Sequence, residues 1–594
     1  MDIPEAFEDD VENKIPILEE VESLHVSGSD NKPTHVLIKG DNYHALTCLN
    51  YTHKEKVDVI YIDPPYNTGN DGKNGFVYKD KRFIEKFPDG TKVDKNNPFR
   101  HSYWLSFMKK RLELARGLLA DSGVLITHID ENEMQNLYLL LAEIFGEAND
   151  LGIIIWDKMN PKGDSRGVST QHEYVLVFAK DKKKFFEKEN ILMRKKQNAV
   201  KILKKAKSLY KKNGKEMIPE EIKEVIKPFN FPKKEISRFK VKYDLEMIKE
   251  EFKNWIRRQD FSGGEKAYKY IDKHGDVYRG VSMAWPNKKT PPKEYFIPLV
   301  HPTTHKECPI PRRGWRYPPD SMKKLLENNE ILFGEDENKQ PERKYLLKEN
   351  LLENTPSIFS DASSDDNLLE DLGVKFDYPK PFNVSKYLIE SIHPNPNIVV
   401  DFFAGSGTTG HAVLEWNKED DTKIQFILVT NDENGIFTDT CYPRLRKILQ
   451  GCKGEVSKRK IKGYKEGLKV YETGFVGKHN ILRTTDSDKI ELAHKAGYLL
   501  AIAENTLNLI EEGSWYQFFE GTNKKTAIYF RENLQEFEEF KQKVIKQNIP
   551  TSVYVFSWGD EEFVDDFEGV SHVKVKTIPI PIVEIYKQIY NLVS

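Results

Sequence analysis

Apolar residues gather in short runs along the first part of the chain, and these runs alternate with longer amphipathic segments. The clearest run, residues 57–62, is rich in β-branched and aromatic side chains and stops at Asp63-Pro64-Pro65. Such a run is typical of a buried parallel strand, and proline cannot continue a central strand. Similar runs predict strands at 124–128, 153–156 and 174–178, and helical spacing predicts helices at 101–120 and 132–145. The alternation predicts an α/β fold with a doubly wound, Rossmann-like sheet.

This alternation of strands and helices stops near residue 180 and returns at 398. Between these points lie lysine-rich helical segments and pieces rich in proline and aromatic residues, which indicate a separate inserted domain. The first 33 residues predict an acidic arm that is helical around residues 15–24. The predicted division is 1–33 (arm), 34–180 and 376–455 (two halves of the doubly wound domain), 181–375 (insertion) and 456–594 (C-terminal α+β domain).

The charge distribution changes the interpretation of the insertion. The whole chain has a formal net charge of −2, which alone argues against a nucleic-acid partner. Residues 181–260, however, hold 25 Lys and Arg against 13 Asp and Glu. A locally basic module inside a neutral chain is typical of contact with phosphates. From charge alone, a solvated lysine-rich helical surface explains the same composition equally well.

Several other classes of protein are disfavoured by composition. No apolar run is long enough for a transmembrane helix, and the acidic start lacks the apolar core of a signal peptide, so we expect a cytoplasmic protein. The cysteines form no closely spaced pair of the kind that structural zinc needs, so we expect no metal site. They are Cys48, Cys308, Cys441 and Cys452.

A glycine-rich segment, DFFAGSGTTG, begins at Asp401 directly after the predicted strand 398–400. Glycines there allow a tight turn and a close approach of the backbone to a ligand, and the aspartate offers an acceptor at the strand end. The next strand ends in the acidic stretch 430–433, where a ribose hydroxyl is typically held. A tight strand-to-helix turn without a ligand has the same pattern. No phosphate-binding P-loop is present, so the pattern favours a nucleoside cofactor.

The segment Asp63-Pro64-Pro65-Tyr66 has the chemistry needed to activate an adenine amine. The exocyclic nitrogen is a poor nucleophile because its lone pair is delocalised into the ring. The carboxylate of Asp63 and the carbonyl of Pro64 would each accept one N6–H and draw the nitrogen towards sp3 geometry. Tyr66 offers a face on which an extruded base can stack. Taken alone, the tetrapeptide is equally consistent with a turn that exposes a tyrosine.

The two segments lie at the ends of predicted parallel strands, where doubly wound sheets bind ligands. In this combination the chain resembles the DNA amino-methyltransferases in which the Asp-Pro-Pro-Tyr half precedes the cofactor half. Further motifs make it similar to the modification (Mod) subunits of type III restriction–modification systems. These motifs are 63–70 (DPPYNTGN), 171–174 (QHEY), 282–288 (SMAWPNK), 313–315 (RGW) and 377–381 (DYPKP).

The resemblance implies a methyl donor, S-adenosylmethionine, and roles for matching positions. Asp63, Pro64, Pro65 and Tyr66 would form the catalytic platform for a flipped adenine. The implied cofactor-binding positions are Asp41, Lys380, Pro381, Asp401, Phe403, Gly405, Gly407, Thr408, Asn431 and Asp432. One departure concerns the second cofactor strand, after which many relatives carry a clear glutamate. Here Asn431, Asp432 and Glu433 are all candidates for the ribose contact.

The resemblance also implies partners. They are double-stranded DNA, a second Mod copy in a homodimer, and a restriction (Res) subunit with helicase and nuclease activities. The insertion 181–375 would then be the target-recognition domain, with lysines on phosphates and a few side chains on bases. Three alternatives stay open: a stand-alone adenine enzyme, an N4-cytosine methyltransferase, and a non-catalytic DNA-recognition subunit. A serine is more usual than Asp63 in the cytosine enzymes, and the intact motifs argue against the non-catalytic subunit.

Overall fold

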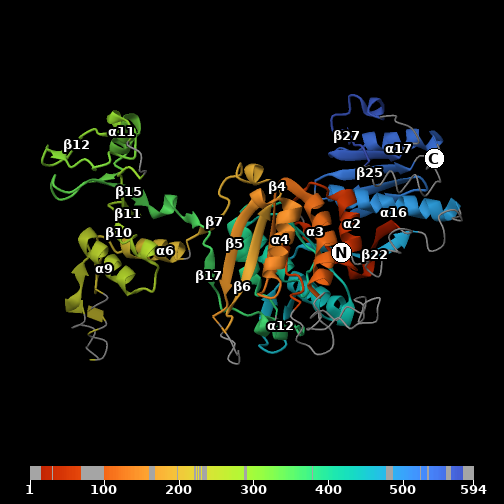
Figure 1. The fold of residues 1–594 in the computed structure, drawn as a ribbon, viewed down its shortest axis with the longest axis horizontal. Helices are drawn as coiled ribbons and strands as arrows, with labels where there is room; N and C mark the ends of the chain where they lie inside the picture. The colour runs from red at the N-terminus through yellow and green to blue at the C-terminus, as the bar shows by residue number, and fades with distance from the viewer. Residues whose placement is uncertain are drawn as a thin grey trace. The chain divides into compact units, whose positions relative to one another are not determined.

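Ten strands form the large sheet of the computed structural model (Figure 1). The structure describes residues 15–578, apart from 30, 68–99, 160–167, 197, parts of 220–236, 287–290, 377–378, 477–485, 522, 531–533 and 557–562. Two compact units share the chain: residues 1–192 with 356–594, and residues 193–355. The end of the motif 63–70, from residue 68, and residues 377–378 of the motif 377–381 lie outside the described residues.

The sheet belongs to the larger unit and is parallel over most of its middle. Parallel pairs join β22, β2, β19, β18, β3 and β4 in succession, and β6 pairs antiparallel with both β4 and β5. The strands in spatial order are β1 (Ile15–Glu20), β22 (Gly467–Val476), β2 (Thr34–Lys39), β19 (Gln425–Thr430), β18 (Ile398–Asp401), β3 (Val57–Ile62), β4 (Leu119–Ile129), β6 (His172–Ala179), β5 (Asp150–Asp157) and β17 (Ile358–Ser360). The predicted α/β class is confirmed.

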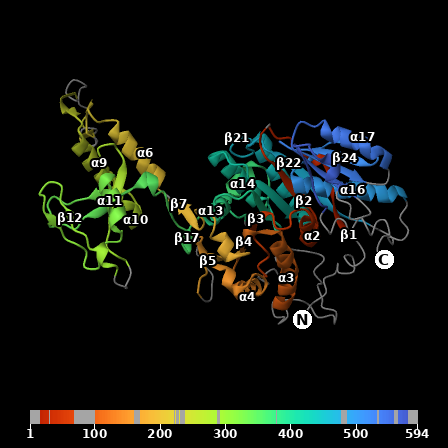
Figure 2. The same ribbon diagram turned by 90° about the horizontal axis from the view of Figure 1, so that it is seen from above.

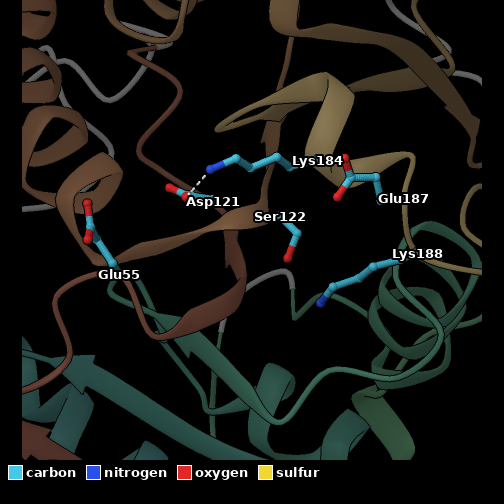
Figure 3. Close-up of a pocket in the computed structure, with 6 residues that line it drawn as sticks. All are labelled: Glu55, Asp121, Ser122, Lys184, Glu187 and Lys188. Carbon is cyan, nitrogen blue, oxygen red and sulfur yellow. Dashed lines mark hydrogen bonds and ion pairs between the residues drawn. The ribbon is translucent and has the colours of Figure 1, made fainter.

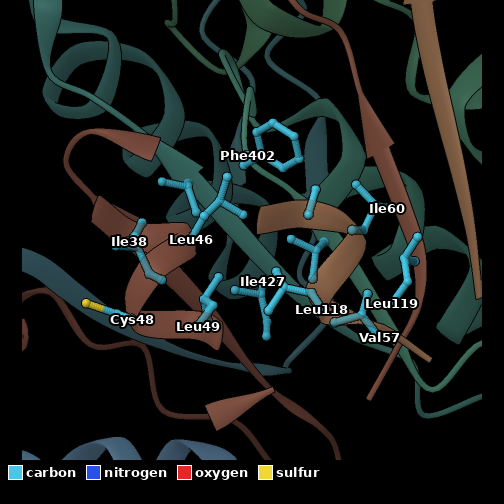
Figure 4. Packing of buried hydrophobic residues seen from close by; sticks show 14 of the residues in the cluster. Ile38, Leu46, Cys48, Leu49, Val57, Ile60, Leu118, Leu119, Phe402 and Ile427 are labelled. Atoms are coloured by element: carbon cyan, nitrogen blue, oxygen red, sulfur yellow. The ribbon is translucent and has the colours of Figure 1, made fainter. Parts of the chain in front are cut away.

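Helices cover both faces of this sheet, as Figure 2 shows for α3 and α4 on one side and α13 and α14 on the other. Alternate residues of β3 enter two different cores: Ile60 and Ile62 one, Val59 and Tyr61 the other. In Figure 4, Leu46 of α2 packs among strand side chains of the first core. The helices are α2 (Asn42–Thr52), α3 (Arg100–Leu118), α4 (Met134–Phe145), α5 (Lys182–Phe185), α12 (Asp366–Asp371), α13 (Phe382–Ile392), α14 (Thr408–Asp420) and α15 (Tyr442–Gln450).

The order of strands reverses between β3 and β18. From β3 the chain passes through α3 to β4 on one side, whereas from β18 it passes through α14 to β19 on the other. The pairs Val59 with Val399 and Ile60 with Val400 fix the register of the two strands. Their carboxyl ends therefore open side by side at the point where doubly wound sheets bind ligands.

The arm differs from its prediction. Residues 15–20 form the strand β1, which pairs antiparallel with β22, and only Glu22–Leu24 are helical, as a short 3-10 turn. Ile17 and Leu18 are both buried. The predicted helix at 15–24 is wrong because pairing with a distant strand outweighs the local amphipathic spacing. Residues 1–14 of the arm lie outside the described residues.

Strand β22 also shows that residues 467–476, predicted within the C-terminal domain, belong to the central sheet. After it come α16 (Asp486–Glu504), α17 (Leu534–Ile545) and a second sheet, whose hydrophobic residues Phe519 and Ile528 join the same core as α2, together with Leu500 of α16. The strands of this second sheet, in order, are β23 (Asn508–Glu512), β24 (Tyr516–Glu520), β25 (Lys525–Phe530), β26 (Thr551–Phe556) and β27 (Val573–Val575). A separate hairpin pairs β20 (Gly451–Lys453) with β21 (Lys460–Lys462).

The smaller unit, 193–355, is narrower than the predicted insertion 181–375, because α5, β17 and α12 belong to the larger unit. It has its own hydrophobic clusters, around Ile248 and Phe252 and around Trp315. The strands β7 (Met193–Lys195) and β16 (Leu352–Asn354), where the chain enters and leaves it, pair antiparallel. Its other elements are α6 (Ala199–Tyr210), α9 (Leu245–Arg258), α10 (Gly263–Lys266), α11 (Pro319–Glu327), β8 (Glu216–Met217), β9 (Val241–Lys242), β10 (Tyr270–Ile271), β11 (Val277–Ser282), β12 (Leu299–Val300), β13 (Glu307–Cys308), β14 (Ile331–Leu332) and β15 (Glu342–Leu346).

The junction of β3 and β18 makes a first prediction. Ile60 is completely buried, so Ile60→Ala should lower the free energy of unfolding by about 2–5 kcal/mol through lost burial and the cavity left behind. Urea unfolding followed by tryptophan fluorescence measures the change. The matched control is Ile358→Ala on β17, where the side chain is 59% exposed and the cost should stay within about 0.5 kcal/mol. An equal loss of unfolding free energy in the two variants would contradict the importance of this junction for the stability of the sheet.

Candidate active site

The Asp63–Tyr66 segment forms a rigid turn at the carboxyl end of β3. Pro64 and Pro65 are buried, and the indole Nε1 of Trp104 on α3 donates a hydrogen bond to the carbonyl of Pro65 at 2.6 Å. Trp104 is itself completely buried, so its position is fixed by the core. The turn is therefore held at the sheet edge by a side chain from α3.

Four polar side chains meet at this turn. The Tyr66 hydroxyl donates to Asp63 Oδ1 at 2.6 Å and lies 3.1 Å from Glu173 Oε2. The Lys380 ammonium donates to the Tyr66 hydroxyl at 2.7 Å and lies 2.8 Å from Glu173 Oε2 and 3.2 Å from Asp63 Oδ2. We call Asp63, Tyr66, Glu173 and Lys380 the platform cluster. The Asp63 side chain is 30% exposed, so a substrate can reach it.

The charges of the platform cluster support one another. Burial raises the pKa of Tyr66 well above its usual value, and Asp63 and Glu173 raise it further. Burial alone would raise the pKa of Glu173, but Lys380, His128 and Lys158 hold it well below its usual range. Burial likewise opposes the charge on Lys380, yet the carboxylates of Asp63 and Glu173 raise its pKa. At neutral pH the tyrosine is therefore neutral, Glu173 is ionised and the lysine is protonated.

The glycine segment follows β18 beside this cluster. Asp401 is 3% exposed; it accepts hydrogen bonds from the backbone N–H of Phe403 at 2.9 Å and from the Thr409 hydroxyl at 2.6 Å. Burial, opposed by these two bonds, raises the pKa of Asp401 to about 7. A buried carboxylate with so high a pKa is stabilised in its ionised form by a cationic ligand, which fits the ammonium group of S-adenosylmethionine.

Two positions of this segment require glycine. Gly405 has φ +50° and Gly407 has φ +81°, and a Cβ on Gly405 would lie 3.3 Å from the ring of Phe376. Gly407 is also the residue from which α14 begins. The backbone thus turns where a side chain would be strained and crowded, as expected for a loop that approaches a ligand closely.

The structure brings the other predicted cofactor residues to the same edge of the sheet. Which residue would contact the ribose is less clearly indicated than the other positions. Asp41 caps α2 by accepting the N–H of Tyr43 at 2.8 Å, and its neighbour Asn42 donates to the Phe402 carbonyl at 3.0 Å. The Thr408 hydroxyl donates to the carbonyl of Lys380 at 3.3 Å, and Pro381 is the cap of α13. The roles of Asp41, Lys380, Pro381, Phe403, Gly405, Gly407 and Thr408 in holding the cofactor stay predictions.

The candidates for the ribose contact follow β19. Asp432 accepts hydrogen bonds from the backbone N–H of Thr438 at 2.9 Å and from its hydroxyl at 2.6 Å, and it lies 3.5 Å from the Lys39 ammonium. Burial opposes ionisation, but these contacts lower the pKa of Asp432. Asn431 accepts the N–H of Glu433 at 3.3 Å. Both side chains thus already have partners in their own loop, and the choice between them stays a prediction.

A buried ion pair behind the glycine segment was not predicted. The Arg444 guanidinium on α15 is completely buried; it lies 2.7 Å from Asp365 Oδ2 and donates to the hydroxyls of Ser406 at 3.0 Å and Thr408 at 3.1 Å. Asp365 in turn accepts the backbone N–H of Phe382, next to Pro381, at 3.2 Å. The pair therefore joins the glycine segment to the segment 380–382.

The sequence gives different signals for the two kinds of missed residue. Glu173 lies in the motif 171–174, which carried the family resemblance but suggested no role. Arg444 and Asp365 have no recognisable spacing, because their partnership exists only after α15 and the segment before α12 pack together.

A charged pocket lies elsewhere (Figure 3). It is lined by Glu55, Asp121, Ser122, Lys184, Glu187 and Lys188. Asp121 and Ser122 belong to the first residues of β4, so the pocket is at the amino end of that strand. The predicted site lies at the opposite, carboxyl edge. Among the described residues, no group of three His, Cys, Asp or Glu side chains suits a metal ion, and no helix is both long and apolar enough to cross a membrane.

A doubly wound sheet that carries a glycine segment and an Asp-Pro-Pro-Tyr turn at its switch point defines the class of amino-methyltransferases. Residues 57–436 match the sequence model of the N6_N4_Mtase family, described as DNA methylase. The chain belongs to this DNA methylase family, which confirms the predicted membership.

Several curated proteins are similar to the chain. The EcoP15I Mod subunit of a type III restriction-modification enzyme from Escherichia coli is 33% identical over 473 residues, which cover 76% of this chain and 67% of that protein. The StyLTI Mod subunit from Salmonella typhimurium is 31% identical over 424 residues, covering 69% of this chain and 54% of that protein. The chain thus spans between about half and two thirds of the length of these relatives.

Among solved structures, a putative DNA modification methylase from Thermus thermophilus, complexed with S-adenosyl-L-methionine, is 11% identical. The alignment covers 74% of this chain and 99% of that chain, with a TM-score of 0.28.

The Arg444–Asp365 pair predicts a distinctive stability pattern. Arg444→Met leaves a buried carboxylate without its cation and should lower the free energy of unfolding by about 3–5 kcal/mol. Replacing both partners in Arg444→Met/Asp365→Leu should recover most of that loss, because no charge then stays buried. Chemical denaturation measures both, with the exposed Arg446 changed to Met as the control that should alter little. A double variant less stable than Arg444→Met would contradict the pairing.

Proposed function

We propose that this protein transfers a methyl group from S-adenosylmethionine to N6 of an adenine extruded from duplex DNA, as the modification subunit of a type III restriction–modification system. The observation that carries the proposal is the register of β3 and β18, which places Asp63 and Asp401 at the same edge of the sheet. One carboxylate then faces the base and the other faces the methyl donor. Family membership and the two Mod relatives support the assignment as a DNA methyltransferase.

On the base side, the chain supplies acceptors and a stacking surface. Asp63 and the carbonyl of Pro64 each accept one N6–H, which localises the lone pair of the amine for attack. Tyr66 stacks on the extruded base, which offsets the few kcal/mol that unstacking costs. Because Trp104 fixes the turn at the Pro65 carbonyl, these acceptors need little rearrangement before the reaction.

On the donor side, the bound S-adenosylmethionine supplies an electrophilic methyl group on a sulfonium ion. Asp401 accepts its ammonium group, and the turn at Gly405 and Gly407 lets the backbone approach it. The backbone of Lys380-Pro381, whose Lys380 carbonyl accepts from Thr408, completes the pocket with Asp41. Asn431 or Asp432 holds the ribose. The low exposure of Asp401 keeps water from competing for its carboxylate.

The alternatives are weaker on specific grounds. Asp63 rather than serine opens the platform motif, which favours adenine over the N4 position of cytosine. The intact platform cluster disfavours a subunit that only binds DNA. The two Mod relatives favour a type III system over a stand-alone enzyme, although the type II methyltransferase M.KpnI from Klebsiella pneumoniae is also 25% identical over 440 residues.

The proposed function also suggests binding partners for the remaining parts of the chain. We assign sequence recognition in DNA to the unit 193–355, with lysines of α6 on phosphates. We place contacts with a second copy in a homodimer, and with a Res helicase-nuclease subunit, on the region after β22. The protein acts in the cytoplasm, where its DNA substrate lies.

A direct test uses duplex DNA, labelled S-adenosylmethionine and nucleoside analysis of the product. We expect N6-methyladenine from the wild type and no transfer from Asp63→Ala, because the amine then lacks its main acceptor. Calorimetry should show donor affinity within about threefold of wild type in this variant, since Asp63 is assigned to the base. N4-methylcytosine as product would overturn the adenine assignment, and absence of any incorporation would favour the non-catalytic subunit.

Donor binding should depend on pH through Asp401. With a pKa of about 7, this group must lose its proton before it pairs with the ammonium group, so affinity rises with pH. Between pH 6 and pH 7 the dissociation constant should fall about fivefold, a range in which the donor's α-amino group stays protonated. Isothermal titration measures the change.

Two variants sharpen this measurement. Asp401→Asn should remove the pH dependence and leave donor binding uniformly weak. Asp432→Asn should keep the fivefold change, because the pKa of Asp432 is lowered and the group is ionised throughout. A uniform loss of affinity in Asp432→Asn would assign the ribose to it, and a pH profile that survives in Asp401→Asn would refute the role of Asp401.

A further inference from the structure

Glu173 is the member of the platform cluster that sequence reasoning left without a role. Its carboxylate lies at the start of β6, and its side chain is 6% exposed. Oε2 accepts from the Lys380 ammonium and lies 3.1 Å from the Tyr66 hydroxyl, while Oε1 pairs with the ammonium of Lys158. A buried carboxylate with this many partners is ionised and firmly placed.

The distances show how Glu173 shares the lysine with Asp63. The Lys380 ammonium is 2.8 Å from Glu173 Oε2 but 3.2 Å from Asp63 Oδ2. Without the charge on Glu173, the lysine would have Asp63 as its single anionic partner in the cluster. A carboxylate engaged in a full salt bridge is a weaker acceptor for an amine.

The reaction itself adds a second reason. As the bond from N6 to the methyl group forms and the C–S bond of the sulfonium breaks to leave a neutral thioether, positive charge develops on N6 until one of its protons is lost. This charge lies next to Asp63 and therefore near Lys380. An uncompensated ammonium there would oppose that charge in a site of low dielectric. The Glu173 carboxylate neutralises the lysine before the reaction begins.

Glu173 also orients the stacking surface. The hydroxyl of Tyr66 is held between Asp63 and Glu173, at 2.6 Å and 3.1 Å, and the Lys380 ammonium lies 4.9 Å from the centre of its ring. The hydroxyl donates to Asp63 and accepts from Lys380, which Glu173 holds in place, and these two hydrogen bonds restrict rotation of the ring about its side-chain bonds. An extruded base thus meets a fixed face rather than a mobile one.

We propose that Glu173 is a positioning residue for methyl transfer, which acts as the counter-ion that holds Lys380 off Asp63 and anchors Tyr66. It acts through Lys380 and Tyr66 and needs no contact with the base. The inference rests on the proposed function, because it concerns the step that Asp63 promotes.

The test is the isosteric change Glu173→Gln, measured by single-turnover methylation and by calorimetry. The rate of transfer should fall about 100-fold, in the range of losing one preorganised electrostatic group. The dissociation constants for S-adenosylmethionine and duplex DNA should stay within about threefold of wild type. A rate close to wild type would overturn the proposal, and so would an equal loss in donor affinity.

Asp58→Asn is a matched control. Asp58 is also a buried acid, at the other end of β3, where it lies 3.2 Å from the Lys188 ammonium and accepts the N–H of Asn397. This variant should lower the melting temperature about as much as Glu173→Gln but leave the transfer rate within about twofold of wild type. A slow Asp58→Asn would show that general destabilisation explains the loss.

A double-variant cycle keeps the test decisive even where Glu173→Gln folds poorly. If the glutamate acts mainly through the lysine, adding Glu173→Gln to Lys380→Met should slow transfer by no more than about threefold. A further loss of tenfold or more in that background would overturn the counter-ion role. Absence of adenine methylation by the wild type would instead refute the proposed function, so the two failures are distinguishable.

Discussion

The parallel pairing of β3 with β18 is the constraint on which the active site depends. The two strands lie far apart in the chain, yet Val59 pairs with Val399 and Ile60 with Val400. This register sets the turn after Ile62 beside the loop after Asp401. Nothing in either segment alone would bring a base and a methyl donor together. The chemistry is therefore a property of one junction within the sheet.

Around this junction the protein buries several charges. Glu173 and Lys380 meet on the base side, and Arg444 and Asp365 meet behind the glycine segment. Burial raises the pKa of Asp365 even with Arg444 beside it, in keeping with the high cost of desolvating such pairs. These pairs fix the positions of their neighbours. Each pair holds several backbone or side-chain groups in one arrangement, whereas a hydrophobic contact would allow those groups to shift.

Much of the fold, and the two segments that meet at its switch point, could be predicted from the sequence because their signals are local. The apolar run before Asp63 and the glycines after Asp401 mark strand ends without knowledge of their neighbours. The strand β1 was missed because its extended form depends on pairing with β22, more than four hundred residues away in the chain. Arg444 and Asp365 were missed for the same reason, since each acquires its partner only in the packed structure. Glu173 lies in a recognised motif, but only folding brings Tyr66 and Lys380 to it.

The two-stranded ribbon of β7 and β16 has an evolutionary consequence. Because the chain enters and leaves the unit 193–355 through adjacent antiparallel strands, the ends of this unit lie next to each other, and its hydrophobic clusters are its own. Such a segment can be exchanged as one continuous piece without cutting the catalytic sheet. If the unit reads DNA as proposed, recombination within a single gene is enough to give an unchanged methyltransferase domain a new target sequence.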